Sequence, residues 1–112
     1  MPKFTSEISK AVDSLIKGKL VAFPTETVYG LGGDATNEEA VRRIYKVKGR
    51  PPNRPLILHV PDVATAKKVV LNWASNESKL AGRFWPGPLT LVLKNGGLVS
   101  ESASAGHKTV AV

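Results

Sequence analysis

Residues 23–60 read FPTETVYGLGGDATNEEAVRRIYKVKGRPPNRPLILHV, and this stretch decides the expected fold. An apolar strand from Leu20 to Phe23 leads into a Pro-Thr-Glu-Thr turn, because Pro24 lacks the backbone donor that a strand needs. A helix and the loop KGRPPNRP follow, and a second apolar strand runs from Leu56 to Val60. This alternation of strands and helices predicts an α/β layer structure.

Polar and charged side chains collect where these elements end. Open α/β sheets bind ligands beyond the ends of their strands, so we expect the groups at one common edge. Hydroxyls, a phenol, three cations and an imidazole suit a polyphosphate together with a small polar co-substrate. The groups are Thr25, Thr27, Tyr29, Lys48, Arg50, Arg54 and His59.

A first helix is expected before this stretch, with Thr5 or Ser6 as its N-terminal cap. Gly18 stands where a left-handed C-terminal cap is expected. The apolar residues recur at the spacing of one buried helical face. That face consists of Ile8, Val12, Leu15 and Ile16.

Three more helices are expected. Thr36 and Glu39 have capping-box spacing and open a helix to about Lys46. Asp62 caps a helix over residues 63–73, and another covers residues 75–84. The inner side of the helix after Thr36 is expected to consist of Ala40, Val41, Ile44 and Tyr45.

The last third of the chain predicts two more strands. Trp85-Pro86-Gly87-Pro88 reads as a rigid turn before a strand over residues 89–94. Residues 95–106, rich in Gly, Ser and Ala, are expected to form a loop, and residues 109–112 begin a further strand.

Composition limits the classes of function. A chain of 112 residues is one domain at most and has no apolar run of the roughly 18 residues that a membrane span needs. The start MPKFTSEISK lacks the apolar core of a signal peptide, so we expect a cytoplasmic protein without membrane contact. The absence of Cys excludes disulfides and thiolate catalysis, and with His59 and His107 far apart we expect no protein-held metal.

The net charge of +7 is concentrated in one segment. A solvated basic surface and a polyanion-binding surface are both compatible with such a charge, but clustering favours the second. The anion could be a nucleotide, an RNA or both. Six cations fall within thirteen residues: Arg42, Arg43, Lys46, Lys48, Arg50 and Arg54.

Each motif also has a purely structural interpretation. PTETVYGLG could be a capped turn with Tyr29 packed inward, and KGRPPNRP a solvated loop, although its three prolines reduce the entropic cost of binding a ligand. A single histidine in an apolar strand, such as His59, is more often structural than functional. Trp85 is expected to pack, with adenine stacking as the alternative.

PTETVYGLG, KGRPPNRPLILHV and WPGPLTLVL, in this order and separation, resemble three signatures of the YrdC-like family of threonylcarbamoyl-AMP synthases. The resemblance implies a twisted open mixed α/β sheet with flanking helices and a concave basic face. It implies an enzyme, a nucleotidyltransferase, that forms L-threonylcarbamoyl-AMP and pyrophosphate from ATP, L-threonine and bicarbonate. The product serves threonylcarbamoyladenosine modification of tRNA.

The resemblance also assigns residues. Lys48 and Arg50 match the family's pair that contacts the nucleotide phosphates, and both are the expected catalytic groups. Arg54 and Thr109 match further ATP-contacting positions. The family's L-threonine pocket corresponds to Thr27 and His59. Magnesium is expected to arrive with ATP, and catalysis to rest on positioning and charge neutralisation without a covalent nucleophile.

The family pattern continues beyond Val112 with an arginine and a Ser-x-Asn segment that this sequence lacks. Residues 1–112 are therefore expected to be the N-terminal portion of a YrdC-like domain, marginally folded or self-associating and inactive alone. Two alternatives stay open: a non-catalytic double-stranded RNA or tRNA-binding module on the same basic face, and a HypF-like relative that handles carbamoyl-adenylate. Expected partners include tRNA and the threonylcarbamoyl-transfer machinery.

Overall fold

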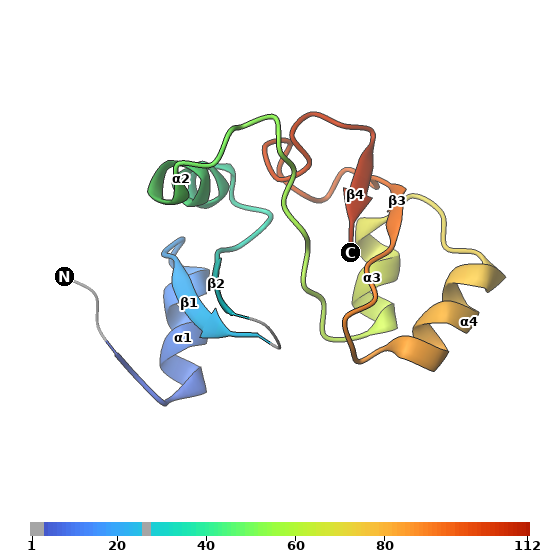
Figure 1. Ribbon diagram of the computed structural model, residues 1–112, viewed down its shortest axis with the longest axis horizontal. Helices are drawn as coiled ribbons and strands as arrows, with labels where there is room; N and C mark the ends of the chain where they lie inside the picture. Colours follow the sequence, from blue (N-terminus) through green and yellow to red (C-terminus); the bar gives the residue numbers. More distant parts are fainter. Residues whose placement is uncertain (1–3, 26–27) are drawn as a thin grey trace.

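A computed structural model describes residues 4–25 and 28–112 (Figure 1). The predicted helices are all present, and the α/β class is confirmed. In chain order the elements are α1 (Ile8–Ile16), β1 (Val21–Pro24), β2 (Tyr29–Gly32), α2 (Glu38–Lys48), α3 (Val63–Val69), α4 (Ser75–Phe84), β3 (Val92–Lys94) and β4 (Thr109–Ala111).

The strands form two antiparallel pairs, β1 with β2 and β3 with β4. In the first pair Val21 lies opposite Gly32 and Pro24 opposite Tyr29. The sequence analysis missed β2, because the Gly residues in YGLGG indicated a bend. β1 and β2 are therefore the two strands of an antiparallel pair, whereas the sequence analysis expected β1 to lead toward a helix.

Helix α1 begins after Glu7, which makes no side-chain capping hydrogen bond, so the predicted cap at Thr5 or Ser6 was wrong. Gly18 has the predicted positive φ of 78°. The expectation that its apolar face is buried was wrong for this chain: Ile8 is 81% exposed and Ile16 73% exposed. The helix contacts mainly β1, on one side only (Figure 1). Periodicity identifies which face of a helix is apolar, but it does not determine what covers that face.

Helix α2 buries the four predicted residues, Ala40, Val41, Ile44 and Tyr45. Its cap is Asn37, whose side chain accepts a hydrogen bond from the Ala40 backbone, and not Thr36 as predicted. The Thr36 hydroxyl donates instead to Asp34. The helix also ends at Lys48, two residues later than predicted and directly before the cationic loop.

The predicted strand over residues 56–60 was wrong as a regular element. These residues are extended, but only one isolated parallel bridge, between Ile57 and Ala111, joins them to β4. A second backbone bond runs from the Leu56 N–H to the Ala103 carbonyl, which belongs to a turn and not to a strand. The partner of this segment therefore changes along its length, and no ladder forms.

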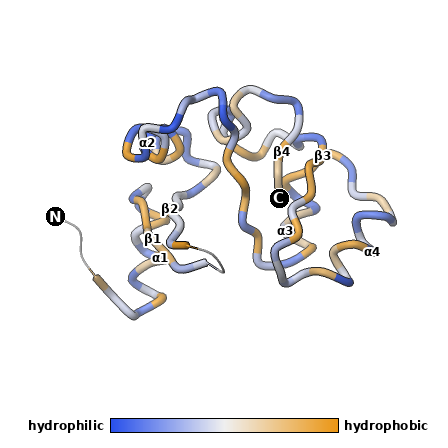
Figure 2. The backbone as a smooth tube through the Cα atoms, viewed as in Figure 1, coloured by the Kyte–Doolittle hydropathy of each residue, from blue (hydrophilic) through white to orange (hydrophobic). Residues whose placement is uncertain are grey.

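The main hydrophobic core lies between this extended segment, α2, α3 and the β3–β4 pair (Figures 1 and 2). The Asp62 cap of α3 is confirmed by a hydrogen bond from the Thr65 backbone, although α3 ends four residues earlier than predicted. Trp85 packs against the core, and its indole N–H donates to the Leu89 carbonyl, as expected for a packing residue. Across residues 4–25 and 28–112, none of the helices combines the length and apolar character required to cross a membrane.

Candidate functional site

The cationic loop begins where α2 stops. Gly49 adopts the left-handed conformation with φ of 63°, which a residue with a Cβ atom adopts only at a cost. Lys46 and Lys48 occupy the last turn of the helix, where positive charge interacts favourably with the helix dipole. The Lys48 side chain is exposed at this end. The helix end therefore presents cations directly beside the loop that carries Arg50 and Arg54.

Arg50 folds back onto its own loop. Its Nε–H donates to the Arg54 carbonyl at 3.3 Å, and one Nη2–H donates to the Pro55 carbonyl at 2.7 Å. A turn bond from the Arg54 N–H to the Pro51 carbonyl closes the same loop. A guanidinium has five N–H donors, so three remain for an anion. The loop thus holds the guanidinium in one place before any ligand arrives.

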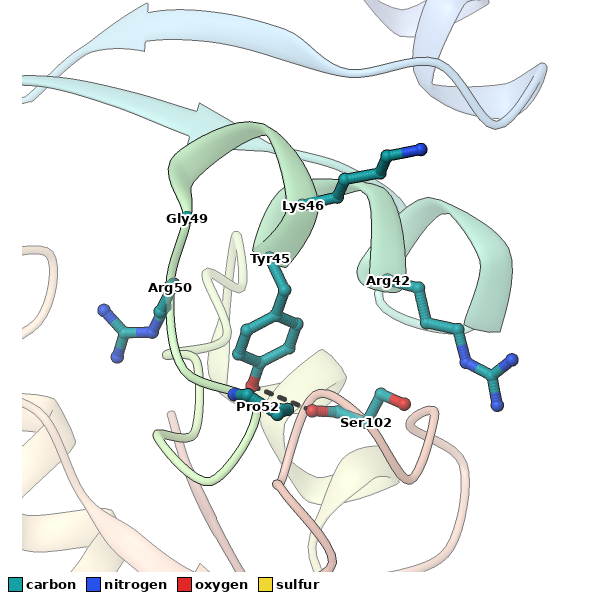
Figure 3. Close-up of a pocket in the computed structure, with 7 residues that line it drawn as sticks. All are labelled: Arg42, Tyr45, Lys46, Gly49, Arg50, Pro52 and Ser102. Atoms are coloured by element: carbon teal, nitrogen blue, oxygen red, sulfur yellow. Dashed lines mark hydrogen bonds between the residues drawn. The ribbon is translucent and has the colours of Figure 1, made fainter.

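Tyr45 connects this loop to the rest of the molecule (Figure 3). Its hydroxyl lies 2.8 Å from the Arg54 carbonyl oxygen and 2.9 Å from the Ser102 carbonyl oxygen. Burial raises the pKa of the hydroxyl above its ordinary value of 10.0, so the proton stays on the oxygen at neutral pH. Ser102 precedes β4, which begins at Thr109, so Tyr45 joins two segments that are far apart in the sequence.

A hollow of about 450 Å³ opens beside Tyr45. Its three cationic side chains extend in different directions around it and do not converge on one point (Figure 3). Among the predicted site residues that the structure describes, only Arg50 lines this hollow, so the hollow by itself does not mark the predicted site. The lining residues are Arg42, Tyr45, Lys46, Gly49, Arg50, Pro52 and Ser102.

Glu38, in the first turn of α2, holds the serine-rich loop from the other side. Its carboxylate accepts hydrogen bonds from the Ser100 hydroxyl at 2.9 Å, the Ser102 N–H at 3.1 Å and the Ser102 hydroxyl at 2.5 Å. Arg42 pairs with the same carboxylate at 3.2 Å. The Ser102 hydroxyl is the main cause that lowers the pKa of Glu38 below 4.5. The positive charge of Arg42 is therefore compensated by Glu38.

The other cations of residues 42–54 do not form ion pairs with the described carboxylates. Within residues 4–25 and 28–112, ion pairs occur only between Lys10 and Glu7, Lys17 and Asp13, and Arg42 and Glu38. Arg43, Lys46, Lys48, Arg50 and Arg54 are thus without a carboxylate partner in the described part of the chain. Five uncompensated cations in twelve residues generate a positive potential that attracts phosphate.

His59 lies on the opposite side of the extended segment from the core. It is exposed, and its ring meets the ring of Phe23 edge-on with 5.9 Å between centroids. The Phe23 ring in turn lies over Gly32, where a Cβ atom would come within 2.7 Å of the ring. Thr27, the other predicted threonine-binding residue, lies outside the described residues. The structure therefore brings His59 to Phe23 of β1, the strand that precedes Thr27 in the sequence.

Thr109 is the first residue of β4, exposed and paired with Lys94. The parallel bridge between Ile57 and Ala111 places two neighbouring segments in the same direction. Arg54 and Thr109 both precede that bridge, whereas His59 follows it. Arg54 and His59 are five residues apart in the sequence, so their Cα atoms lie at most about 17 Å apart.

Sequence reasoning did not identify Tyr45, Glu38 or Ser102 as parts of this region. Tyr45 was correctly expected on the inner face of α2, but nothing local signals that its hydroxyl meets two carbonyls. In the described part of the chain, no three His, Cys, Asp or Glu side chains are grouped so that they could hold a metal ion.

Residues 13–112 match the Sua5/YciO/YrdC family, which carries the description telomere recombination. The chain belongs to this family. The threonylcarbamoyl-AMP synthase of Pyrococcus abyssi is 47% identical over 106 residues, which are 95% of this chain and 31% of that relative. The threonylcarbamoyl-AMP synthase of Bacillus subtilis is 43% identical over 107 residues, with the same coverage.

Solved structures of the family have the same fold. The crystal structure of P. abyssi Sua5 complexed with L-threonine is 48% identical and has a TM-score of 0.90, covering 94% of this chain and 31% of that chain. Full-length HypF, with 24% identity and a TM-score of 0.81, shows a shared fold alone. The chain therefore spans about a third of the length of these two curated synthases.

Proposed function

We propose that this chain supplies the phosphate-binding part of an L-threonylcarbamoyladenylate synthase, which joins L-threonine, bicarbonate and ATP into threonylcarbamoyl-AMP with release of pyrophosphate. Family membership supports the reaction class. The observation that carries the proposal is the loop after α2, where Arg50 is held by the Arg54 and Pro55 carbonyls and three guanidinium donors stay available.

In this proposal Lys48, Arg50 and Arg54 surround the triphosphate, and Thr109 contacts the nucleotide from β4. The amine of threonine combines with bicarbonate and loses water to give a carbamate. A carbamate oxygen then attacks the α-phosphorus, and the bond to the pyrophosphate oxygen breaks. Charge on the leaving pyrophosphate grows in this step, so cations already in place lower the barrier without reorganisation.

His59 and Thr27 are proposed to form the threonine pocket. The exposed His59 ring at Phe23 is consistent with this role, because Phe23 belongs to β1, the strand that precedes Thr27 in the sequence. Magnesium would arrive with ATP and supply further charge neutralisation. ATP as a substrate, and tRNA as the molecule that the product serves to modify, also motivate a proposed cytoplasmic location.

A chimera tests the proposal, because the chain spans only a third of its relatives. Residues 1–112 replace the matching segment of the P. abyssi protein, and pyrophosphate release is measured with and without threonine and bicarbonate. We expect release that requires both. If the parent protein is active and a folded chimera releases no pyrophosphate, the proposal fails.

Within the chimera, Arg50→Ala should weaken ATP binding by about 1.5–3 kcal/mol, the range for charge-assisted hydrogen bonds, or roughly 10- to 150-fold. Arg43→Ala is the matched control, since it removes the same charge from an exposed position on α2. Equal effects of the two substitutions would reduce the role of Arg50 to general electrostatics and would contradict a specific phosphate contact.

A tRNA partner is proposed on the same basic face, where Arg43, Lys46 and Lys48 are exposed without ion pairs to the described residues. An RNA-binding module alone would show salt-sensitive RNA affinity and no pyrophosphate release. A synthase releases pyrophosphate whether or not RNA is present, so the two functions separate in the same set of assays.

A further inference from the structure

We infer that Tyr45 is a positioning residue for the nucleotide: it clamps the cationic loop at both ends and so fixes Arg50 in the orientation that phosphate requires. The inference rests on the proposed ATP-binding role of the loop. It adds to that role the residue that sets the loop's shape, which no local feature of the sequence indicates.

The two ends of the loop meet the same residue. At its start, the Arg50 N–H donates to the Tyr45 backbone carbonyl at 3.0 Å. At its end, the Arg54 carbonyl lies 2.8 Å from the Tyr45 hydroxyl. Tyr45 is buried and belongs to α2, so we expect it to stay in place while the loop residues are held against it. These two contacts fix the distance between the two ends of the loop, residues 50–54.

The position of the Arg50 guanidinium depends on the shape of this loop. Its Nε–H binds the same Arg54 carbonyl that the Tyr45 hydroxyl meets, and its Nη2–H binds the next carbonyl, of Pro55. If the Arg54 carbonyl moves, both acceptors of the guanidinium move with it. The proline residues at positions 51, 52 and 55 limit how far the loop can move, but they donate no hydrogen bond that could replace the phenol.

Tyr45 also contacts the loop that leads to Thr109, the other proposed part of the nucleotide site. The Tyr45 hydroxyl lies 2.9 Å from the Ser102 carbonyl, in the loop that leads to Thr109 (Figure 3). Glu38, seven residues earlier on the same helix, holds that loop through Ser100 and Ser102. The Tyr45 hydroxyl thus joins the cationic loop, which carries Arg50 and Arg54, to the serine-rich loop, which leads to Thr109.

The test is Tyr45→Phe, because phenylalanine keeps the buried ring and removes only the hydroxyl. The first measurement is the solvent exchange of the Arg50 Nε–H in the chimera by nitrogen-15 NMR, and the second is the ATP dissociation constant of the chimera by calorimetry. We expect faster exchange and an ATP affinity lower by about threefold to tenfold, the loss of one uncharged hydrogen bond. Tyr29→Phe, which removes an exposed hydroxyl, is the control for the exchange signal.

Unchanged Arg50 exchange in a folded Tyr45→Phe chain would overturn the inference, and so would faster exchange with unchanged ATP affinity. An unfolded variant would also overturn it, because the hydroxyl would then serve the stability of the core and not the loop. A chimera with wild-type residues 1–112 that binds no ATP while its Arg50 Nε–H is protected would instead refute the proposed function on which the inference rests.

Discussion

Glu38→Gln tests whether the carboxylate of α2 holds the serine-rich loop. The wild-type carboxylate accepts hydrogen bonds from two serine hydroxyls and one backbone N–H, the shortest of them 2.5 Å. Glutamine keeps the shape and one acceptor oxygen, but it loses the charge that strengthens all three bonds. The substitution therefore removes charge assistance without opening a cavity.

The expected cost is modest. Hydrogen bonds to charged groups contribute roughly 1.5–3 kcal/mol and those between neutral groups about 0.5–1.5 kcal/mol, so the difference is about 1 kcal/mol. The Glu38 side chain is 38% exposed, which places the estimate at the lower end of what three bonds could give. We therefore expect the free energy of unfolding at pH 7 to fall by about 1 kcal/mol.

The pH dependence of the stability difference between wild type and Glu38→Gln is a more specific test. The Ser102 hydroxyl and the other donors depress the pKa of Glu38 in the folded state below 4.5. Its contribution to stability is therefore fully present above the unfolded-state pKa and is lost as pH falls through the folded-state value. The difference in stability between wild type and Glu38→Gln should shrink toward zero on acidification.

Urea unfolding from pH 7 to about pH 3 measures this difference. Glu39→Gln is the matched control, because Glu39 lies in the same first turn, is exposed and interacts with the same helix dipole. Equal losses in the two variants would assign the effect to the dipole. A difference that persists at low pH would refute the reasoning about the Glu38 carboxylate.

Three further outcomes are expected. His59→Ala should raise the KM for threonine in the chimera more than the KM for ATP, and equal increases would indicate a structural histidine. Val41→Ala should destabilise the chain by about 2 kcal/mol in urea unfolding, because Val41 is 1% exposed and loses two methyl groups with a residual cavity; an unchanged midpoint contradicts this. The isolated chain should self-associate in sedimentation through the exposed Ile8 and Ile16, and Ile8→Lys with Ile16→Lys should reduce the association; a wild-type monomer at all concentrations argues against it.

Local chemistry determined much of what the sequence predicted correctly. The Asp62 cap, the bounds of α4 and the inner face of α2 depend on residues three or four positions apart, which the chain specifies without distant partners. The cationic cluster after α2 and the family signatures also stand in the sequence itself, so the reaction class could be expected before any coordinates.

Only the tertiary structure decided which groups meet across long stretches of chain. Residues 56–60 look like a strand, yet their neighbours alternate between a turn and β4, so no ladder forms. The sequence correctly identified which residues form the apolar face of α1, but it did not predict that this face is exposed. The Tyr45 hydroxyl meets Ser102, 57 residues away, because α2 and the serine-rich loop pack on the same core. Hydrogen bonds of this kind depend on the placement of whole elements, and no periodicity or spacing in the sequence encodes them.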